Sequence, residues 1–200
     1  LSQIQHPVVT GASFIALEFL EIFVKNGIKP QLIAPDRYFF ERLLDPTGGK
    51  LLQKNFEEHG ISVMFQDMLV KIEQGVEPLT AITKDGKKIS CDAINVGVGI
   101  ERSRDFLHGS SVEMGERGVL TNEFLETNVD GVWAAGDIAE FNDLVAGVRH
   151  AVGNWNNAFL QGKRAGLNML GQQRAFSNVP FYSITNLGLQ ITALGGCDGQ

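Results

Sequence analysis

The sequence is poor in the residues that build disulfide scaffolds and metal centres. Its 200 residues include only two cysteines, Cys91 and Cys197, which rules out a disulfide-rich fold and a four-cysteine zinc site. The four histidines show no HExxH or other paired-ligand spacing. We therefore expect no metal site, and we expect Cys91 to be a buried strand residue.

Long apolar runs and an excess of positive charge are also missing. No segment reaches the roughly 18 consecutive apolar residues of a membrane-spanning helix, and no cationic leader precedes an apolar stretch. The net charge of −6 argues against binding to nucleic-acid phosphates, which needs a basic face. We expect a cytoplasmic protein that neither spans a membrane nor binds nucleic acid. Because the chain lacks an initiating Met, we expect it to be a piece of a longer protein.

Apolar residues and glycine, by contrast, are plentiful. The chain is 44% hydrophobic and 20% charged, so it can bury a core. The order of the expected elements begins as strand, helix, strand, helix, strand, with the second helix capped by Asp45 and Pro46. These elements are expected at residues 8–10, 14–26, 31–34, 45–59 and 61–65.

The hydrophobic pattern then changes to short alternating strands with a hairpin signal at Asp85–Gly86. A small antiparallel meander is expected at residues 69–72, 79–83 and 87–90, followed by a strand at 93–96. The polar stretch 101–117 reads as a domain crossover. Further elements are a buried strand at 132–135, a helix at 154–170, a loop from 176 and a strand at 189–194.

The turn after the first strand carries the first chemical motif. Gly11-Ala12-Ser13-Phe14-Ile15-Ala16 matches the GxGxxA form of a dinucleotide fingerprint, except that serine stands at the second glycine position. In such a turn the helix N-terminus faces the pyrophosphate, which the side chain of Ser13 could crowd. The alternative is an ordinary strand-to-helix turn.

The end of the second strand should indicate the coenzyme. An acidic residue is expected there for the ribose 2′-hydroxyl, but Ala34 occupies the position. Asp36 follows two residues later and favours NADH, whereas the next residue, Arg37, could accept a 2′-phosphate. A solvated loop without a coenzyme role is the third interpretation.

A second motif lies near the middle of the chain, in the segment TNVDGVWAAGD that ends at Gly136–Asp137. A glycine at a strand end permits close approach of a ligand, and the following carboxylate can accept hydrogen bonds from sugar-like hydroxyls. A capping role for Asp137 is the structural alternative.

Together these segments resemble the FAD- and NAD(P)-dependent pyridine nucleotide-disulfide oxidoreductases, in the branch with apoptosis-inducing factor, ferredoxin reductases and rubredoxin reductase. The likeness covers essentially the whole chain. It is carried by VVTGASFIALE, NVGVG, TNVDGVWAAGD, NWNNAFLQGKRAGLNMLG and VPFYSITNLGLQITALGG. One departure is Ser183, where the family has an aromatic residue beside the flavin.

The resemblance implies cofactor-binding residues but no proton-transfer catalyst. Glu18 would lie near the nicotinamide or be a buried helix carboxylate, and Trp155 would lie near the flavin or pack in the helix core. The full expected set is Gly11, Ala12, Ser13, Phe14, Ile15, Ala16, Glu18, Asp36 and Arg37 for NAD(P)H, Gly97 and Gly99 at backbone positions along the nucleotide, and Gly136, Asp137, Asn154 and Trp155 for FAD.

The resemblance also implies an α/β fold with three parts. A Rossmann-like NAD(P)-binding domain, with a parallel sheet and an antiparallel meander, is expected at residues 1–99. Residues 100–175 would be the second half of a discontinuous FAD-binding domain, and 176–200 the start of an interface domain. The family's first FAD-binding segment is not among these residues, so we expect the 200-residue piece alone to be inactive.

The function this implies is hydride transfer from NAD(P)H to FAD, with electrons passing to a small molecule or a small redox protein, in a chain that could form a homodimer. A nucleotide-binding regulatory or scaffold module with little turnover is the alternative. A short-chain dehydrogenase is excluded, because its Tyr-xxx-Lys pair is missing: Arg42 and Asn186 stand four residues after Tyr38 and Tyr182.

Overall fold

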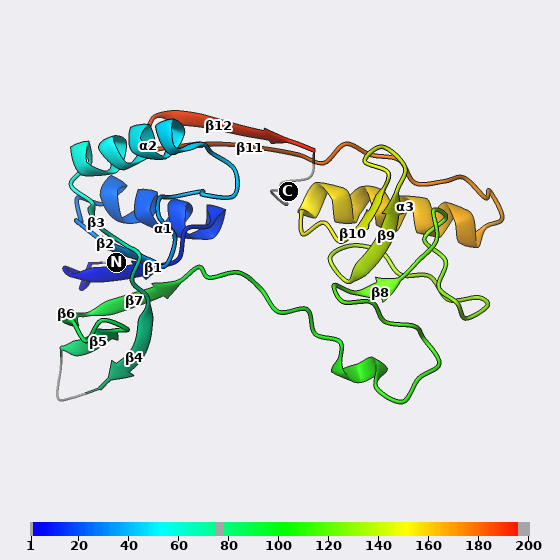
Figure 1. Ribbon diagram of the computed structural model, residues 1–200, viewed down its shortest axis with the longest axis horizontal. Coiled ribbons are helices and arrows are strands. Elements are labelled where there is room, and N and C mark those ends of the chain that lie inside the picture. The colour runs from blue at the N-terminus through cyan, green and yellow to red at the C-terminus, as the bar shows by residue number, and fades with distance from the viewer. Residues whose placement is uncertain (1, 75–77, 196–200) are drawn as a thin grey trace. The chain divides into compact units, whose positions relative to one another are not determined.

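The computed structural model describes residues 2–74 and 78–195, which form two compact units (Figure 1). The first unit contains Leu1–Ile100 together with Ile184–Ile191, and the second contains Glu101–Ser183 together with Thr192–Gln200. The chain therefore passes to the second unit after Ile100, returns to the first at Ile184 and passes to the second again after Ile191. Cys197 lies outside the described residues.

A four-stranded parallel sheet forms the centre of the first unit. Its strands are β1 (Pro7–Thr10), β2 (Gln31–Ala34), β3 (Ser62–Phe65) and β7 (Ala93–Val96), in the order β3-β2-β1-β7. β1 is central and completely buried, and it pairs with β2 on one side and β7 on the other. Because all four strands run in one direction, their carboxyl ends share one edge, where α/β sheets bind ligands.

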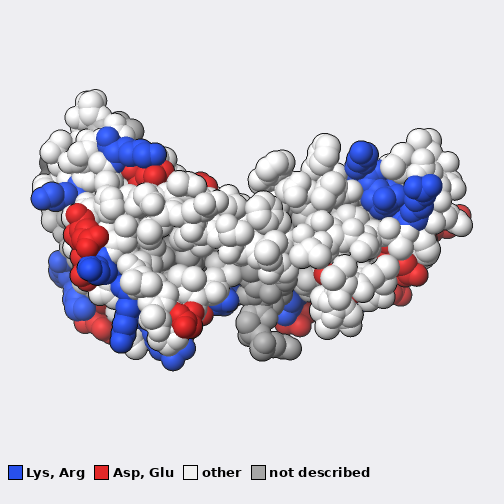
Figure 2. Space-filling model, turned by 90° about the horizontal axis from the view of Figure 1, so that it is seen from above, with Lys and Arg blue, Asp and Glu red and all other residues white. Residues whose placement is uncertain are grey.

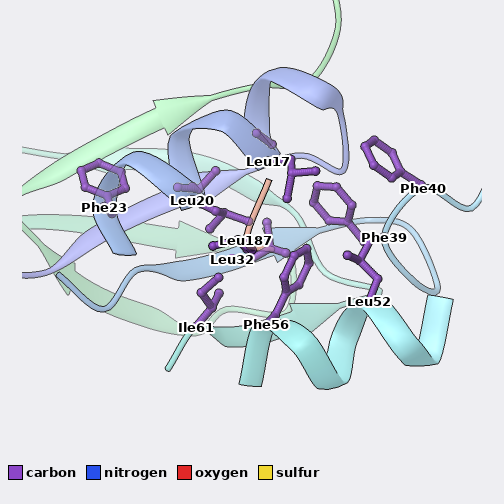
Figure 3. Packing of buried hydrophobic residues seen from close by; sticks show 12 residues of the cluster. Leu17, Leu20, Phe23, Leu32, Phe39, Phe40, Leu52, Phe56, Ile61 and Leu187 are labelled. Atoms are coloured by element: carbon purple, nitrogen blue, oxygen red, sulfur yellow. The ribbon is translucent and has the colours of Figure 1, made fainter. Parts of the chain in front are cut away.

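Two helices cover one face of this sheet, α1 (Phe14–Lys25) and α2 (Pro46–Glu58) (Figure 1). Asp45 caps α2 as predicted: its carboxylate accepts a hydrogen bond from the Gly48 N–H at 2.7 Å. Figure 3 shows the core between the helices and the sheet, to which the loop after β2 contributes Phe39 and Phe40. The two rings pack edge to face, with centroids 4.7 Å apart.

The predicted antiparallel meander is confirmed, and it covers the other face of the sheet. It consists of β4 (Leu69–Glu73), β5 (Leu79–Thr83) and β6 (Lys88–Cys91). Ala81 and Cys91 from the meander pack against Val8 and Ile33 of the sheet. Cys91 is a buried strand residue, and burial raises the pKa of its thiol above the ordinary value.

The second unit is built around one helix and a small sheet. The helix is α3 (Trp155–Met169), and the sheet has the order β10-β9-β8 with β8 (Val119–Leu120), β9 (Ala139–Asp143) and β10 (Val148–His150). A single 3₁₀ turn, η1 (Asp105–Leu107), interrupts the crossover segment. The core is formed by Leu125, Phe141, Ala165 and Phe176.

The predicted buried strand at 132–135 is wrong. In this segment only Trp133 makes a ladder contact, a single antiparallel bridge to Glu126, and Val132 is exposed. Residues 125–127 lie beside it and form two backbone hydrogen bonds with it, from the Thr127 N–H to the Val132 carbonyl at 2.9 Å and from the Ala134 N–H to the Leu125 carbonyl at 3.1 Å. The pairing extends no further than this single bridge, so the run does not become a strand.

The predicted loop after residue 176 is also wrong in part. Residues Phe181–Asn186 form β11, which pairs with β12 (Leu189–Leu194) in a two-stranded hairpin. The tip of this hairpin, Leu187, is 5% exposed and belongs to the core of the first unit (Figure 3). Glu21 of α1 fixes the tip by accepting hydrogen bonds from the Leu187 N–H at 3.0 Å and from Asn186 Nδ2 at 2.9 Å.

The surface carries charges of both signs. On the face shown in Figure 2, basic and acidic side chains of the first unit are interspersed. No helix within the described residues is long and apolar enough to cross a membrane.

Candidate functional site

The turn between β1 and α1 is shaped so that its first residue must be glycine. Gly11 has φ +109°, a conformation that side chains disfavour, and a Cβ there would lie 2.3 Å from the Gly97 carbonyl oxygen. The Gly11 N–H donates to the Ile33 carbonyl at 2.9 Å. The turn is therefore wedged between the ends of β2 and β7 at the carboxyl edge of the sheet.

Ser13 begins α1 as its N-cap and also binds β7. Its hydroxyl donates to the Gly97 carbonyl at 2.6 Å and accepts from the Ala16 N–H at 3.2 Å. The side chain thus points toward the end of β7, so serine fits here without crowding a phosphate placed before the helix N-terminus. Gly97 is equally constrained, because a Cβ would lie 2.9 Å from the Ala16 backbone nitrogen.

The other residues predicted around this turn have different surroundings. Phe14 packs its ring against Phe40 with centroids 4.6 Å apart, whereas Ile15 is exposed. Ala12 is half-buried, and Gly99 has open space around its Cα. The carboxylate of Glu18 is half-buried and has no hydrogen bond or ion pair to any residue that the structure describes, which leaves it available to a ligand.

The segment after β2 leaves the same edge of the sheet. Ala34 is completely buried, so the position expected for an acidic residue is occupied by a small core residue. Asp36 is half-buried, and its carbonyl accepts from the Gln66 N–H at 3.1 Å. Arg37 is not a free cation: its Nε donates to Glu41, and its backbone N–H donates to the same carboxylate at 2.8 Å.

In the second unit, the Gly136–Asp137 turn packs against α3. Gly136 has φ +83°, and its N–H donates to Oε1 of the buried Gln161 at 2.7 Å. The Asp137 carbonyl accepts a hydrogen bond from Arg102 Nε, which fixes the backbone and leaves the half-buried carboxylate for other partners. Within the described residues no N–H donates to that carboxylate, so the capping alternative for Asp137 gains no support.

The start of α3 lies beside this turn. Asn154 is its N-cap and accepts from the N–H groups of Asn156 at 2.8 Å and Asn157 at 3.3 Å. The amide of Asn154 also donates to the Phe181 carbonyl at 3.1 Å. Trp155 is 76% exposed, so the interpretation of this residue as helix-packing core is wrong.

Two buried amides on α3 were not predicted from the sequence. Asn157 and Gln161 are completely buried one helical turn apart, and their side-chain N–H groups find no acceptor within the described residues. Burying an unpaired amide donor costs about 1–3 kcal/mol. The sequence contains one signal for them. Asn157 and Gln161 are four residues apart and lie on the same buried face of α3 as Ala165, so polar side chains occupy positions where a core helix has apolar ones.

These orphan donors provide the test of whether a flavin nucleotide fits the second unit. The nucleotide is rich in hydroxyl and phosphate acceptors. The Gln161 side chain lies next to the glycine turn, because its oxygen accepts the hydrogen bond from the Gly136 N–H. A tight glycine turn, an adjacent carboxylate and unpaired donors form a donor and acceptor set that fits such a group. In the first unit, the turn at the N-terminus of α1 is tight at Gly11 and Gly97. It fits a dinucleotide pyrophosphate, because a helix N-terminus presents backbone N–H groups to an anion.

The predicted residues therefore fall into two clusters. One joins Gly11, Ser13, Ala16 and Gly97 in the first unit, and the other joins Gly136, Asp137 and Asn154 in the second. Ser183, which replaces the expected aromatic residue, is exposed and shares a hydrogen bond with Thr192 at 2.9 Å.

Residues 1–162 match the model of the pyridine nucleotide-disulphide oxidoreductases. The chain belongs to this family. The expected α/β fold, with its Rossmann-type parallel sheet, is confirmed by solved structures of the same architecture.

Individual relatives support the assignment along the whole chain. Human apoptosis-inducing factor 3 is 27% identical over 206 residues, covering 100% of this chain and 33% of its own length. An NADH oxidase from Methanocaldococcus jannaschii is 28% identical over 188 residues, covering 94% of this chain and 42% of its own. A ferredoxin reductase structure from Rhodopseudomonas palustris has a TM-score of 0.88 at 20% identity, covering 96% of this chain and 47% of that one. The chain thus spans less than half the length of these relatives.

Proposed function

We propose that this chain supplies the NAD(P)H-binding domain and the second half of the FAD-binding domain of a flavin-dependent oxidoreductase. The observation that carries the proposal is the tight packing of the turn between β1 and α1, where Gly11 and Ser13 both contact Gly97. A turn this tight brings the backbone and the helix N-terminus close to whatever lies at the sheet edge, as a pyrophosphate requires. Membership of an oxidoreductase family supports the same function.

In the proposed reaction the residues of this chain bind and orient. Gly11 to Ala16 would hold the pyrophosphate of NAD(P)H, with Glu18 one turn further along α1. Gly136 and Asp137 would hold the sugar-like chain of the flavin nucleotide, with the amides of Asn157 and Gln161 behind them. Bound FAD would supply the two-electron acceptor for the hydride of the nicotinamide.

The acceptor that takes the electrons onward is a small molecule or a small redox protein, and a homodimer is the proposed assembly. We also propose a cytoplasmic location, which cell fractionation would test. NADH is the proposed coenzyme, because Asp36 is the acidic residue that follows β2 at the sheet edge.

Stopped-flow reduction of the flavin by NADH in the full-length protein is the direct test. We expect reduction within the turnover times of ordinary enzymes, which have rates of about 1–1000 per second. The alternative function, a nucleotide-binding scaffold with little turnover, predicts binding of both cofactors but reduction slower by orders of magnitude. That outcome would replace the oxidoreductase proposal.

A further inference from the structure

The loop between β2 and α2 lies where the adenosine ribose of a dinucleotide is expected. The hydrogen bond from Gly11 to Ile33 ties the nucleotide turn to the last residues of β2, and Asp36 is tied to the end of β3 through Gln66. In dinucleotide-binding folds, the residues that leave β2 at this point distinguish a ribose 2′-hydroxyl from a 2′-phosphate.

Within this loop, Glu41 binds Arg37 with both carboxylate oxygens. Oε1 accepts from the guanidinium Nε, and Oε2 accepts from the Arg37 backbone N–H at 2.8 Å. The side chain of Glu41 is 24% exposed, compared with 68% for Arg37, so the carboxylate is less accessible to solvent than the guanidinium. The contact lowers the pKa of Glu41 through the backbone and side-chain hydrogen bonds of Arg37, so the carboxylate is charged at neutral pH.

The loop itself fixes this pair in place. Phe39 and Phe40 anchor it in the core, and the Phe40 carbonyl accepts from the N–H groups of Leu43 at 2.7 Å and Leu44 at 2.8 Å. The guanidinium lies 5.9 Å from the ring centroid of Tyr38, whose hydroxyl donates to the Leu44 carbonyl at 3.2 Å. An exposed ion pair usually contributes little, because two mobile side chains must be ordered. Here the backbone has already placed both partners.

The charge balance of the loop opposes a phosphate. Between β2 and α2 the three carboxylates of Asp36, Glu41 and Asp45 outnumber the two cations of Arg37 and Arg42, so the loop carries a net charge of −1. A neutral ribose hydroxyl meets no such opposition. A 2′-phosphate could accept hydrogen bonds from all the N–H groups of the guanidinium only after the guanidinium had moved away from Glu41.

We propose that Glu41 determines the coenzyme preference of this site: by holding Arg37 it disfavours NADPH and makes the protein selective for NADH. This inference rests on the proposed function, since it presumes that the turn binds NAD(P)H. It differs from an assignment to Asp36 alone, because the decisive carboxylate lies outside the position that the dinucleotide pattern indicates.

The test is calorimetric titration of the full-length protein and its variants with NADH and with NADPH. Glu41→Gln removes the charge while keeping the shape of the side chain. We expect it to tighten NADPH binding roughly tenfold or more, the value of a hydrogen bond to a charged group, and to leave NADH binding unchanged. The matched control is Glu58→Gln, which breaks an exposed helix pair with Lys54 and should alter neither affinity.

Two further variants identify the cation that is released. Arg37→Ala alone should leave NADPH affinity nearly as weak as in the wild type, and Arg37→Ala added to Glu41→Gln should abolish the gain. A gain that survives this addition would overturn the proposal, since it would then come from a neighbour such as Arg42. An unchanged NADPH affinity in Glu41→Gln would overturn it too, while normal NADH binding would leave the proposed function intact. A wild type that binds neither coenzyme would refute both.

Discussion

Single atoms at the sheet edge determine the shape of the turn between β1 and α1. The Gly97 carbonyl oxygen receives the Ser13 hydroxyl and lies where a Gly11 Cβ would be, so three residues from two strand ends share one small volume. Ser13 departs from the glycine fingerprint without opening the turn. A second glycine would allow close packing because it has no side chain, whereas the Ser13 hydroxyl allows it by forming a hydrogen bond with the Gly97 carbonyl. The departure is therefore a different solution to the same packing problem.

The tightness of this turn predicts a large effect for Gly11→Ala. A methyl group must displace the Gly97 carbonyl, so unfolding free energy should fall by roughly 1–3 kcal/mol from overpacking in addition to the backbone cost. Gly27→Ala is the matched control, because Gly27 also has positive φ, +72°, but no atom lies within 4 Å of its Cβ position. Urea unfolding of both variants gives the comparison, and equal losses would contradict the close packing.

At Asp137 the prediction concerns affinity. A hydrogen bond to a charged group contributes roughly 1.5–3 kcal/mol, so Asp137→Ala should weaken FAD binding by the apoprotein about 10- to 150-fold. The Asp137 carbonyl contact with Arg102 survives the substitution, so apoprotein melting should be unchanged. Asp130→Ala, an exposed carboxylate nearby in sequence, is the control. Unchanged affinity with lowered apoprotein melting would make Asp137 a structural residue.

Elements with local signals were predictable, and those that depend on distant partners were not. α2 was predicted because Asp45 and Pro46 mark its start, and α1 because its apolar residues recur at helical spacing. β9, with the sequence AEFND, has no clear alternation: four of its five residues are buried, including Glu140 and Asp143. Glu140 is buried because it accepts from the N–H groups of Arg117 and Gly118, which no local pattern reveals.

The hairpin formed by β11 and β12 leads to a prediction at the level of elements. Leu187 at its tip fills the core of the first unit, so Leu187→Ala should lower unfolding free energy by about 2–5 kcal/mol, as for other buried leucines. Leu194→Ala at the end of β12 is the control, because Leu194 is 69% exposed. Equal stability of the two variants in denaturant titrations would show that the tip does not anchor the hairpin.

For the whole molecule, the sequence indicates the fold and the segments that form the candidate site. It does not indicate the side-chain contacts that surround these segments. The parallel sheet and both glycine turns follow from short patterns, because the positive φ of Gly11 and Gly136 favours glycine at those positions. The Glu41–Arg37 pair depends on how the loop between β2 and α2 folds, and the unpaired amides of Asn157 and Gln161 depend on how α3 packs. No local sequence pattern predicts either. The wrong strand at 132–135 failed for the same reason.

The stability of the protein should depend on acid through Asp143. Burial alone would raise the pKa of this carboxyl, but hydrogen bonds from the N–H groups of Ala146 and Val145 and from His150 lower it below the ordinary value. Because the folded pKa is depressed, the contribution is full above the unfolded pKa of about 3.9 and is lost as pH falls through the folded value.

Asp143→Asn should therefore lose most stability at neutral pH and little at the acid end. Urea unfolding across this pH range gives the difference between wild type and variant at each pH. A difference that stays constant with pH would contradict the role of the charge. Asp105→Asn is the control, because the Asp105 side chain is 96% exposed.

The return of the chain to the first unit has a consequence for how the protein is made. Residues 184–191 leave the ribosome only after the whole of 101–183, yet Leu187 completes the core that α1 and α2 began. At about 5–20 residues per second, several seconds separate the two. During that interval the place of Leu187 in this core stays unfilled, so the unit that is synthesised first is completed only after most of the second unit has been made.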